Sequence, residues 1–460
     1  MRSPEVIAIP RAPLRPLVGK EVRDVLSGRA LWIMLLILCP LVGYSFFQAV
    51  SLYAEASAAA HDQPALASGL SPLDGVLVPS FGALYVATTL LFPFVAIRAL
   101  GREKETGALR LLVQLPYRAA TLAVAKMAAI AAAWLIVAVP ALSTIGLWII
   151  LGGHVHLPEM LNLLLGQLLY GLLVGAIALF SASVSESSAS AAIIALAFTI
   201  CSWVLDFALA GQPGLLDWIA RLSLTQTLRP FEQGLFSLAL VIGLTCTLTG
   251  FLALAAIWLH PGVALRAKVL RSLLCVAAAA ALLALTSGIR QSIDLSEDRR
   301  NSFPAADQLA LAQLREPLLI TVHLAPEDPR YIDLRRSVLA KLERIVPRLT
   351  IRMSIGGQSV IASTSDERYG EVEYAYAGRS AISRSTSPRE VLPLIYELAE
   401  RPVPAPIAAA DYPGYPLVSS ARAALPWFFG LLPILIAGVW WWTRRPPAIP
   451  SSLVKEGGRP

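Results

Sequence analysis

The side chains best suited to binding a partner lie in one basic insert, residues 98–126, which reads RALGREKETGALRLLVQLPYRAATLAVAK between two long apolar runs. A short helix that carries charges on one face and leucines on the other can lie in the groove of a soluble partner. The insert is therefore a candidate binding and coupling element. The alternative is a solvated loop on the membrane surface without a partner. Its cations are Arg98, Arg102, Lys104, Arg110, Arg118 and Lys126.

Motifs for catalysis are missing from the sequence. It holds no G-x-x-x-x-G-K-[ST] loop to cradle phosphates, and no catalytic Ser/His/Asp arrangement. His154 and His156 read better as turn residues than as zinc ligands. The four cysteines, Cys39, Cys201, Cys246 and Cys275, all fall in apolar runs, without metal-ligand spacing. We predict a non-enzymatic chain that binds no cofactor or metal itself.

Composition assigns the chain to the polytopic membrane proteins. Of its 460 residues 56% are hydrophobic and 15% charged, and the mean hydropathy of +0.63 is too high for a soluble protein of this length. One helical crossing takes about 20 apolar residues. By that measure eight spans are predicted, at about 30–50, 78–98, 124–151, 161–183, 189–210, 235–258, 271–288 and 425–442.

The loops give the orientation, because Lys and Arg are retained on the cytoplasmic side. Cations gather before the first span, in the basic insert, after the sixth span and after the eighth, whereas residues 51–77 and 152–160 have none. Both termini are thus predicted to be cytoplasmic, in a bacterial inner membrane, and residues 289–424 to be extracytoplasmic. The net charge of +7 then reflects topology and attraction to membrane lipid, without nucleic acid.

An amphipathic helix is predicted before the first span, over residues 14–29. Its apolar residues fall close to one face, with charges opposite, so it should lie along the inner membrane surface. The apolar positions are Leu14, Leu17, Val18, Val22, Val25 and Leu26.

Two segments together carry a family resemblance. The interfacial stretch LVGKEVRDVL and the insert GREKETGALRLLVQLP occur in the order, spacing and topology of permease subunits of ABC-2 type transporters, which the chain resembles. Matching interfacial positions are Lys20, Glu21, Arg23 and Asp24. Matching insert positions are Arg102, Glu103, Thr106, Gly107, Leu109, Leu112, Pro116 and Lys126.

The resemblance implies a six-span permease core at 30–260. In that family the first cytoplasmic loop docks on a separate nucleotide-binding ATPase, which would supply ATP and Mg²⁺, and the permease works as a homodimer or with a second permease. Around the core we predict a cytoplasmic N-terminus at 1–29, a seventh span within 261–288, an eighth at 425–442 and a cytoplasmic tail at 443–460.

Residues 289–424 have ordinary globular composition and the order of a β-α-β unit. Strands are predicted at 318–324 and 349–355 around a helix at 331–346, with a further strand at 372–376 and a helix at 388–400. A right-handed crossover would make the first two strands parallel. A small α/β domain follows, and the Pro-rich stretch 401–416 would return the chain to the membrane.

The opening of this domain resembles that of GldG-like auxiliary subunits of ABC transporters. The matching residues are Asp294, Leu295, Ser296, Arg299, Ser302 and Phe303. Together the two resemblances imply a permease fused to its auxiliary partner.

The expected function is ATP-driven export as the membrane subunit of an ABC complex. The main alternative is an ATP-driven mechanotransmission or assembly scaffold that acts on an extracytoplasmic protein partner. An ATP-independent channel or secondary transporter is disfavoured, because charges are scarce in the spans. The substrate stays open between lipids, glycans, peptides and drugs.

Overall fold

Eight helical segments in the computed structural model are long and apolar enough to cross a membrane, and they coincide with the eight predicted spans. The structure describes residues 14–115, 117–208, 223–260, 262–286, 288–289, 291–325, 328–354, 368–405 and 412–444. Those eight helices, by length and composition, indicate a multi-pass membrane protein.

Single helices form the first, fourth, fifth, sixth and seventh spans: α2 (Arg29–Asp62), α8 (Leu157–Val184), α9 (Ser188–Ala208), α12 (Leu238–Leu259) and α13 (Leu265–Thr286). Three spans are segmented. The second consists of η2 (Leu73–Leu77), α3 (Val78–Leu90) and α4 (Phe92–Glu105), the third of α6 (Ala119–Val137) and α7 (Val139–Ile150), and the eighth of η4 (Ala421–Ala424), η5 (Trp427–Leu431) and α19 (Leu432–Thr443).

Prolines account for the breaks inside the second and third spans. Pro79, Pro93 and Pro140 lie in the first turns of α3, α4 and α7. Proline has no N–H to donate and its ring clashes with the preceding turn, so it is tolerated best at the start of a helix. Each span therefore stays continuous overall but restarts at its proline.

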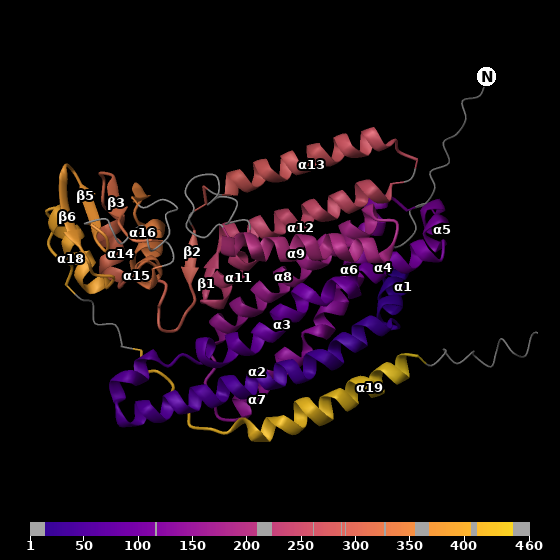
Figure 1. The fold of residues 1–460 in the computed structure, drawn as a ribbon, viewed down its shortest axis with the longest axis horizontal. Coiled ribbons are helices and arrows are strands. Elements are labelled where there is room, and N and C mark those ends of the chain that lie inside the picture. The colour runs from indigo at the N-terminus through magenta and orange to yellow at the C-terminus, as the bar shows by residue number, and fades with distance from the viewer. Residues whose placement is uncertain are drawn as a thin grey trace, which may run out of the picture.

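The last two spans lie at opposite edges of the bundle (Figure 1). The α13 helix packs on α12 and has no buried residue, whereas α19 packs along α2. Gly43 of α2 allows the eighth span to come close, because a Cβ at Gly43 would overlap the side chain of Phe428 in η5. The chain thus leaves the bundle at one edge and returns at the other.

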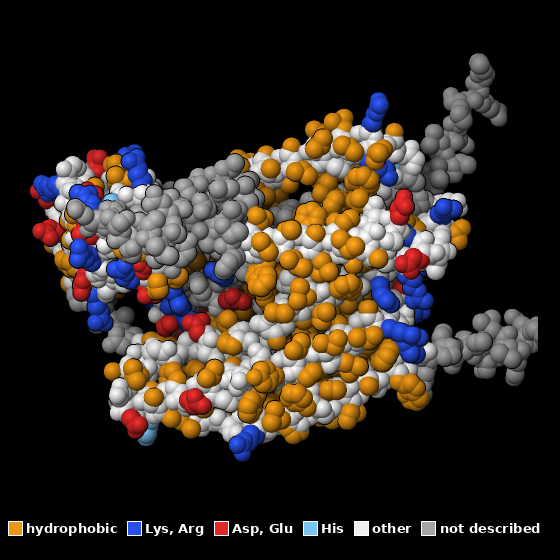
Figure 2. Space-filling view, viewed as in Figure 1, with side chains coloured by type: hydrophobic (Ala, Val, Ile, Leu, Met, Phe, Trp, Pro, Cys, Tyr) orange, Lys and Arg blue, Asp and Glu red, His pale blue; other side chains and the backbone are white. Residues whose placement is uncertain are grey.

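The bundle has two distinct ends. The short helices α1 (Leu14–Leu26) and α5 (Ala108–Gln114) lie with the last residues of α19 at one end, which we call the basic end. Arg444, which follows α19, lines a cavity there together with Asp24 of α1. The opposite end, which we call the sheet end, carries η1 (Pro64–Gly69), α11 (Leu224–Glu232) and the strands (Figure 1). Between the ends, Figure 2 shows a broad band of hydrophobic side chains, the surface expected to face lipid.

A small sheet domain with strand order β4-β3-β5-β6 occupies the sheet end. As predicted, β3 (Leu318–Val322) and β4 (Leu349–Met353) are parallel, and the connecting helix consists of α15 (Pro329–Leu334), η3 (Arg335–Leu339) and α16 (Ala340–Ile345). The other elements are α14 (Ala305–Ala312), β5 (Val372–Tyr376), β6 (Arg379–Ser383) and α18 (Pro388–Leu398). The second core of the molecule lies here, between this sheet and its helices.

The sixth span begins later than the sequence predicts. Residues Leu235–Ser237 form β1, which pairs antiparallel with β2 (Ser292–Asp294), and α12 starts only at Leu238. The Ser237 hydroxyl caps α12 by accepting from the Leu240 N–H at 3.4 Å. This two-stranded ribbon ties the start of the sixth span to the chain that follows the seventh.

Candidate functional site

Four consecutive charged residues end α4, Arg102-Glu103-Lys104-Glu105. Successive residues of an α-helix point about 100° apart, so four in a row face almost every direction around the axis. Each of the four side chains contacts a different part of the structure. Arg102 lines a surface cavity, whereas Glu103, Lys104 and Glu105 each bind residues of other helices. The end of α4 is therefore the hub of the basic end.

Glu103 belongs to a buried ionic cluster. The Lys126 ammonium donates to a Glu103 carboxylate oxygen at 2.5 Å, to Glu21 Oε2 at 2.9 Å and to the Ala99 carbonyl at 2.8 Å. The Lys126 side chain is only 1% exposed. Its three donors thus all have acceptors, as a buried ammonium requires. The contacts join α1, α4 and α6.

Lys20 completes this cluster from the surface. Its ammonium lies 2.6 Å from Glu103 Oε1, 3.1 Å from Glu21 Oε1 and 3.3 Å from Asp24 Oδ2. Partial burial alone would lower the pKa of Lys20, but the hydrogen bond that Lys20 donates to Glu103 and the nearby carboxylates raise that pKa above its usual value. We call Lys20, Glu21, Asp24, Glu103 and Lys126 the basic-end cluster.

The neighbouring charges bind the end of α4 to two more spans. The Lys104 ammonium donates to the carbonyls of Ala182, Ser183 and Ser185 at 2.7–2.9 Å, where it caps the C-terminus of α8. Ser188, at the start of α9, donates to Glu105 at 2.5 Å. Sequence reasoning missed both contacts, although the run of four alternating charges at a span's end was the signal for them.

A tight turn connects the short helix α5 to the end of α4. Thr106 donates its hydroxyl to the Arg102 carbonyl at 2.9 Å, and Gly107 has a left-handed backbone with φ of +75°. Glycine suits this position because any side chain there is strained. The turn redirects the chain from the axis of α4 into α5.

The leucines of α5, together with Leu115 directly after it, divide between two environments. Leu109 is half-buried against the bundle core, and Leu112 is half-buried against Leu17 and Leu122. Leu111 and Leu115 are 68% and 47% exposed. The apolar residues thus form two sets instead of one groove-binding face, and the outward set is Leu111 with Leu115.

The remaining predicted positions are more exposed or not described. Arg23 and Arg102 are exposed, and no ion pair joins either to the basic-end cluster within the described part of the chain. Pro116 lies outside the described residues. The structure therefore brings together Lys20, Glu21, Asp24, Glu103 and Lys126, and places Thr106, Gly107, Leu109 and Leu112 in the turn and helix beside them.

A second ionic cluster holds the sheet end to the spans. The Arg300 guanidinium pairs with Asp74 of η2, with Asp298 at 2.8 Å and with Glu159 of α8 at 3.3 Å, and it donates to the Ser71 hydroxyl at 2.7 Å. We call Asp74, Glu159, Asp298 and Arg300 the sheet-end cluster. It connects the second and fourth spans to the loop that enters the sheet domain.

His154, predicted as a turn residue, also contacts this loop. Its Nε2 lies 2.9 Å from Glu297, and its ring stacks on Tyr415 at 3.6 Å between centroids. The Tyr415 hydroxyl donates to the same Glu297 at 2.5 Å. Among the residues that the structure describes, no group of three or more His, Cys, Asp or Glu could hold a metal ion.

Asp294 organises the loop between β2 and the sheet domain. Its Oδ2 accepts from the Asn301 N–H at 3.0 Å and from the Ser302 hydroxyl at 2.7 Å. Asn301 in turn donates to the Gln233 carbonyl at 2.7 Å. Residues of the predicted opening motif thus stabilise this loop by hydrogen bonds, and the bond from Asn301 to Gln233 holds the loop beside α11.

The fold and the two clusters define a multi-pass membrane protein whose spans are tied together at both ends. Residues 15–235 match the family model described as ABC-2 family transporter protein. The matched segment contains almost all of α1, the first five spans and the whole basic-end cluster. This match supports the assignment of the chain as an ABC-2 permease, the membrane component of an ABC transporter. No curated protein and no solved structure matches the chain.

Proposed function

We propose that this chain is the membrane-spanning permease subunit of an ABC transporter complex and couples ATP hydrolysis by a separate ATPase to export across the bacterial inner membrane. The observation that carries the proposal is the hub at the end of α4. There the short, partly exposed helix α5 follows directly on residues of α4 that contact α1, α6, α8 and α9, all inside the segment that matches the family.

The outward side of α5 is the proposed docking surface for the ATPase. Leu111 and Leu115 are exposed apolar side chains, and the neighbouring Arg110 and Gln114 are exposed as well. A few apolar anchors with a polar rim are typical of protein interfaces. The inward side, Leu109 and Leu112, would transmit the movement of α5 to α1 and α6.

The contacts of α4 suggest how that movement spreads. Glu103 leads to α1 and α6, Lys104 to α8, and Glu105 to α9. A displacement of the α5 turn would therefore move the ends of several spans together. Such rigid-body shifts of packed helices are the usual basis of two-state switching.

Three further features belong to the proposal. The basic end would face the cytoplasm, so that the sheet domain is extracytoplasmic, in keeping with the distribution of Lys and Arg. The unburied α13 and the sparsely buried outer faces of α9 and α12 leave room for a second copy or a second permease. The domain opening at Asp294 would correspond to a GldG-like auxiliary unit.

A second function is favoured by the sheet-end cluster. Arg300 connects the second span, which also contains the α4 hub, to the loop that enters the sheet domain. Movement at the basic end could thus reach the sheet domain without opening a path for a substrate. The alternative is an ATP-driven mechanotransmission or assembly scaffold that acts on an extracytoplasmic partner.

The first experiment is purification of the chain from native membranes, with identification of co-purifying proteins and an assay of ATP hydrolysis. A P-loop ATPase should co-purify with the native chain and be lost with Leu111→Glu. Leu66→Glu is the matched control, because Leu66 is 51% exposed but lies in η1 at the sheet end. Equal ATPase recovery with all three chains would contradict the docking surface.

A second measurement separates export from scaffolding. Spin labels on the sheet domain and on α8 should report an ATP-dependent change of distance if the scaffold function holds, and Arg300→Gln should abolish the change while ATPase binding persists. If the distance is constant through the ATP cycle, the scaffold function fails and export remains.

A further inference from the structure

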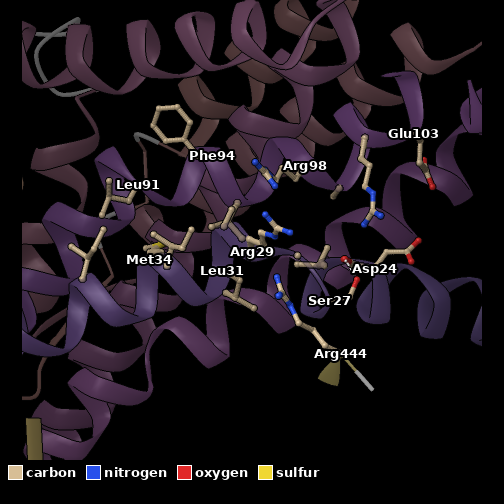
Figure 3. A pocket seen from close by; sticks show the side chains of 18 residues that line it. Asp24, Ser27, Arg29, Leu31, Met34, Leu91, Phe94, Arg98, Glu103 and Arg444 are labelled. Atoms are coloured by element: carbon tan, nitrogen blue, oxygen red, sulfur yellow. Dashed lines mark hydrogen bonds between the residues drawn. The ribbon is translucent and has the colours of Figure 1, made fainter. Parts of the chain in front are cut away.

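A cavity of about 670 Å³ opens at the basic end, between the α1–α2 junction, α4 and the end of α19. Figure 3 shows the guanidinium groups of Arg29, Arg98 and Arg444 directed toward the same part of this cavity, with Leu91, Phe94 and Met34 to one side. Arg102 also lines it. Four guanidinium groups therefore share one concave surface.

The two carboxylates that line the cavity do not neutralise these arginines. Asp24 pairs with Lys20 at 3.3 Å, and Glu103 pairs with Lys20 and Lys126 at 2.6 and 2.5 Å. Within the described residues, Arg29, Arg98 and Arg102 have no ion pair, and Arg444 lies over the Trp440 ring at 4.4 Å. The cavity thus has a surplus of positive charge that an anion would relieve.

The apolar part of the lining continues away from the arginines along two helices. Ile33 and Ile37 follow Arg29 by about one and two turns of α2, so they lie about 6 and 12 Å further along its axis. Phe94 precedes Arg98 by about 6 Å on α4, and Leu91 lies directly before the first residue of that helix. Ile33, Ile37 and Phe94 are each more than 40% exposed, so they are free to contact a ligand.

We propose that this cavity binds one anionic phospholipid from the adjacent membrane leaflet. Its phosphate would pair with the guanidinium groups, which bind phosphate bidentately, and its acyl chains would lie against Ile33, Ile37 and Phe94. Basic pockets between spans are typical sites for anionic headgroups. A free phosphate would use the arginines alone, whereas the lining also offers the apolar path that a lipid needs.

The site would share α1 and α4 with the basic-end cluster. A bound lipid contacts α2, α4 and the residue after α19, and Glu103 lies between the cavity and Lys126. Lipid occupancy would hold the first, second and eighth spans together at this end. The inference does not depend on an ATPase, because it concerns binding to the purified chain alone.

The test uses the full chain in detergent, by native mass spectrometry and thermal denaturation with added phosphatidylglycerol or phosphatidylcholine. We expect phosphatidylglycerol to be retained and to raise the Tm, and phosphatidylcholine to do neither. Arg29→Gln with Arg98→Gln should weaken phosphatidylglycerol binding by about tenfold or more. Arg23→Gln with Arg118→Gln is the control of equal charge, because these exposed arginines at the same end do not line the cavity.

Three outcomes would overturn the proposal. Equal weakening by the control pair would mean that binding follows overall charge. Inorganic phosphate that stabilises the chain as well as the lipid would assign the cavity to a free anion. Phe94 is 44% exposed, so Phe94→Ala should not disturb folding. If this variant retains the lipid as well as the native chain does, the acyl chains do not lie along the proposed apolar path.

Discussion

Lys126 and Glu103 form a buried ion pair at 2.5 Å between two different spans, 23 residues apart in the chain. The same ammonium reaches Glu21, 105 residues away, on α1, whose 13 residues are too few to span a bilayer. One lysine thus sets the position of α1 relative to α4 and α6. Helices in a bilayer gain little from apolar burial against one another, so polar contacts of this kind are important for their arrangement.

Lys126→Met should destabilise the chain strongly. It leaves Glu21 and Glu103 near each other without their buried partner, which costs about 3–5 kcal/mol in comparable cases. The measurement is the temperature at which buried Cys39 becomes reactive, with Cys201, Cys246 and Cys275 changed to Ser. Lys20→Met is the control, and its effect should be smaller because Lys20 is 43% exposed. Adding Glu103→Gln to Lys126→Met should restore part of the loss, and a double variant less stable than Lys126→Met contradicts the assignment.

Gly107→Ala should disturb the turn into α5 without unfolding the bundle. A side chain at φ of +75° costs about 1–2 kcal/mol, and α5 should become more accessible to protease. Gly19→Ala serves as the control, because a Cβ at Gly19 meets nothing within 4 Å and helix propensity favours alanine by about 1 kcal/mol. Equal protease sensitivity of the two variants is the result that counts against this role of Gly107.

Arg300→Gln should loosen the sheet domain from the spans. The substitution removes the ion pairs to Asp74, Glu159 and Asp298, so hydrogen exchange should rise in residues 294–302 and in η2. Arg389→Gln, an exposed arginine of α18, should leave exchange in both segments unchanged. Unaltered exchange in Arg300→Gln shows that the cluster does not hold the two parts together.

The sheet domain should lose stability at low pH through Asp328. Its carboxylate accepts hydrogen bonds from Arg330 and Tyr369, which lower its pKa to about 2. A lowered pKa stabilises the folded state above pH 4, and that contribution disappears as the pH falls toward 2. Arg330 is half exposed, so the effect should be on the order of 1 kcal/mol.

Asp328→Asn tests this dependence, because the amide oxygen can still cap α15 at the Arg330 N–H. The native chain should show faster hydrogen exchange in α15, corrected for the intrinsic rate, between pH 4 and 2.5. The variant should be faster than the native chain at pH 6 and change less on acidification. Identical pH profiles of the two chains rule out the proposed contribution.

Local patterns were sufficient to predict most elements. The eight spans, the interfacial helix and the parallel β3-β4 pair with its crossover helix were all predicted, because each depends on the spacing of apolar residues along a short segment. The strand β6 was missed. It is an edge strand that reads RSAIS, with exposed and half-buried residues, and it lacks an apolar alternation strong enough to be recognised.

The ribbon of β1 and β2 could not be read from either segment alone. Leu235–Ser237 continues into the apolar run of α12 and by itself looks like the start of a span. Its strand conformation depends on pairing with Ser292–Asp294, which the seventh span separates from it in sequence. Strand pairing is a long-range interaction, so the sequence of a three-residue segment does not show whether the segment will pair.

The sequence by itself determined the membrane class, the spans, the small α/β domain and the two motifs at Lys20–Asp24 and Arg102–Gly107, because hydropathy, periodicity and motif spacing are local properties. Tertiary structure decided what those motifs contact. It joined Glu21, Glu103 and Lys126 in one buried cluster, turned Leu112 inward and Leu111 outward, and gathered four arginines from three segments around one cavity. Burial and pairing of charges depend on which helices pack side by side, and helix packing is a property of the whole bundle.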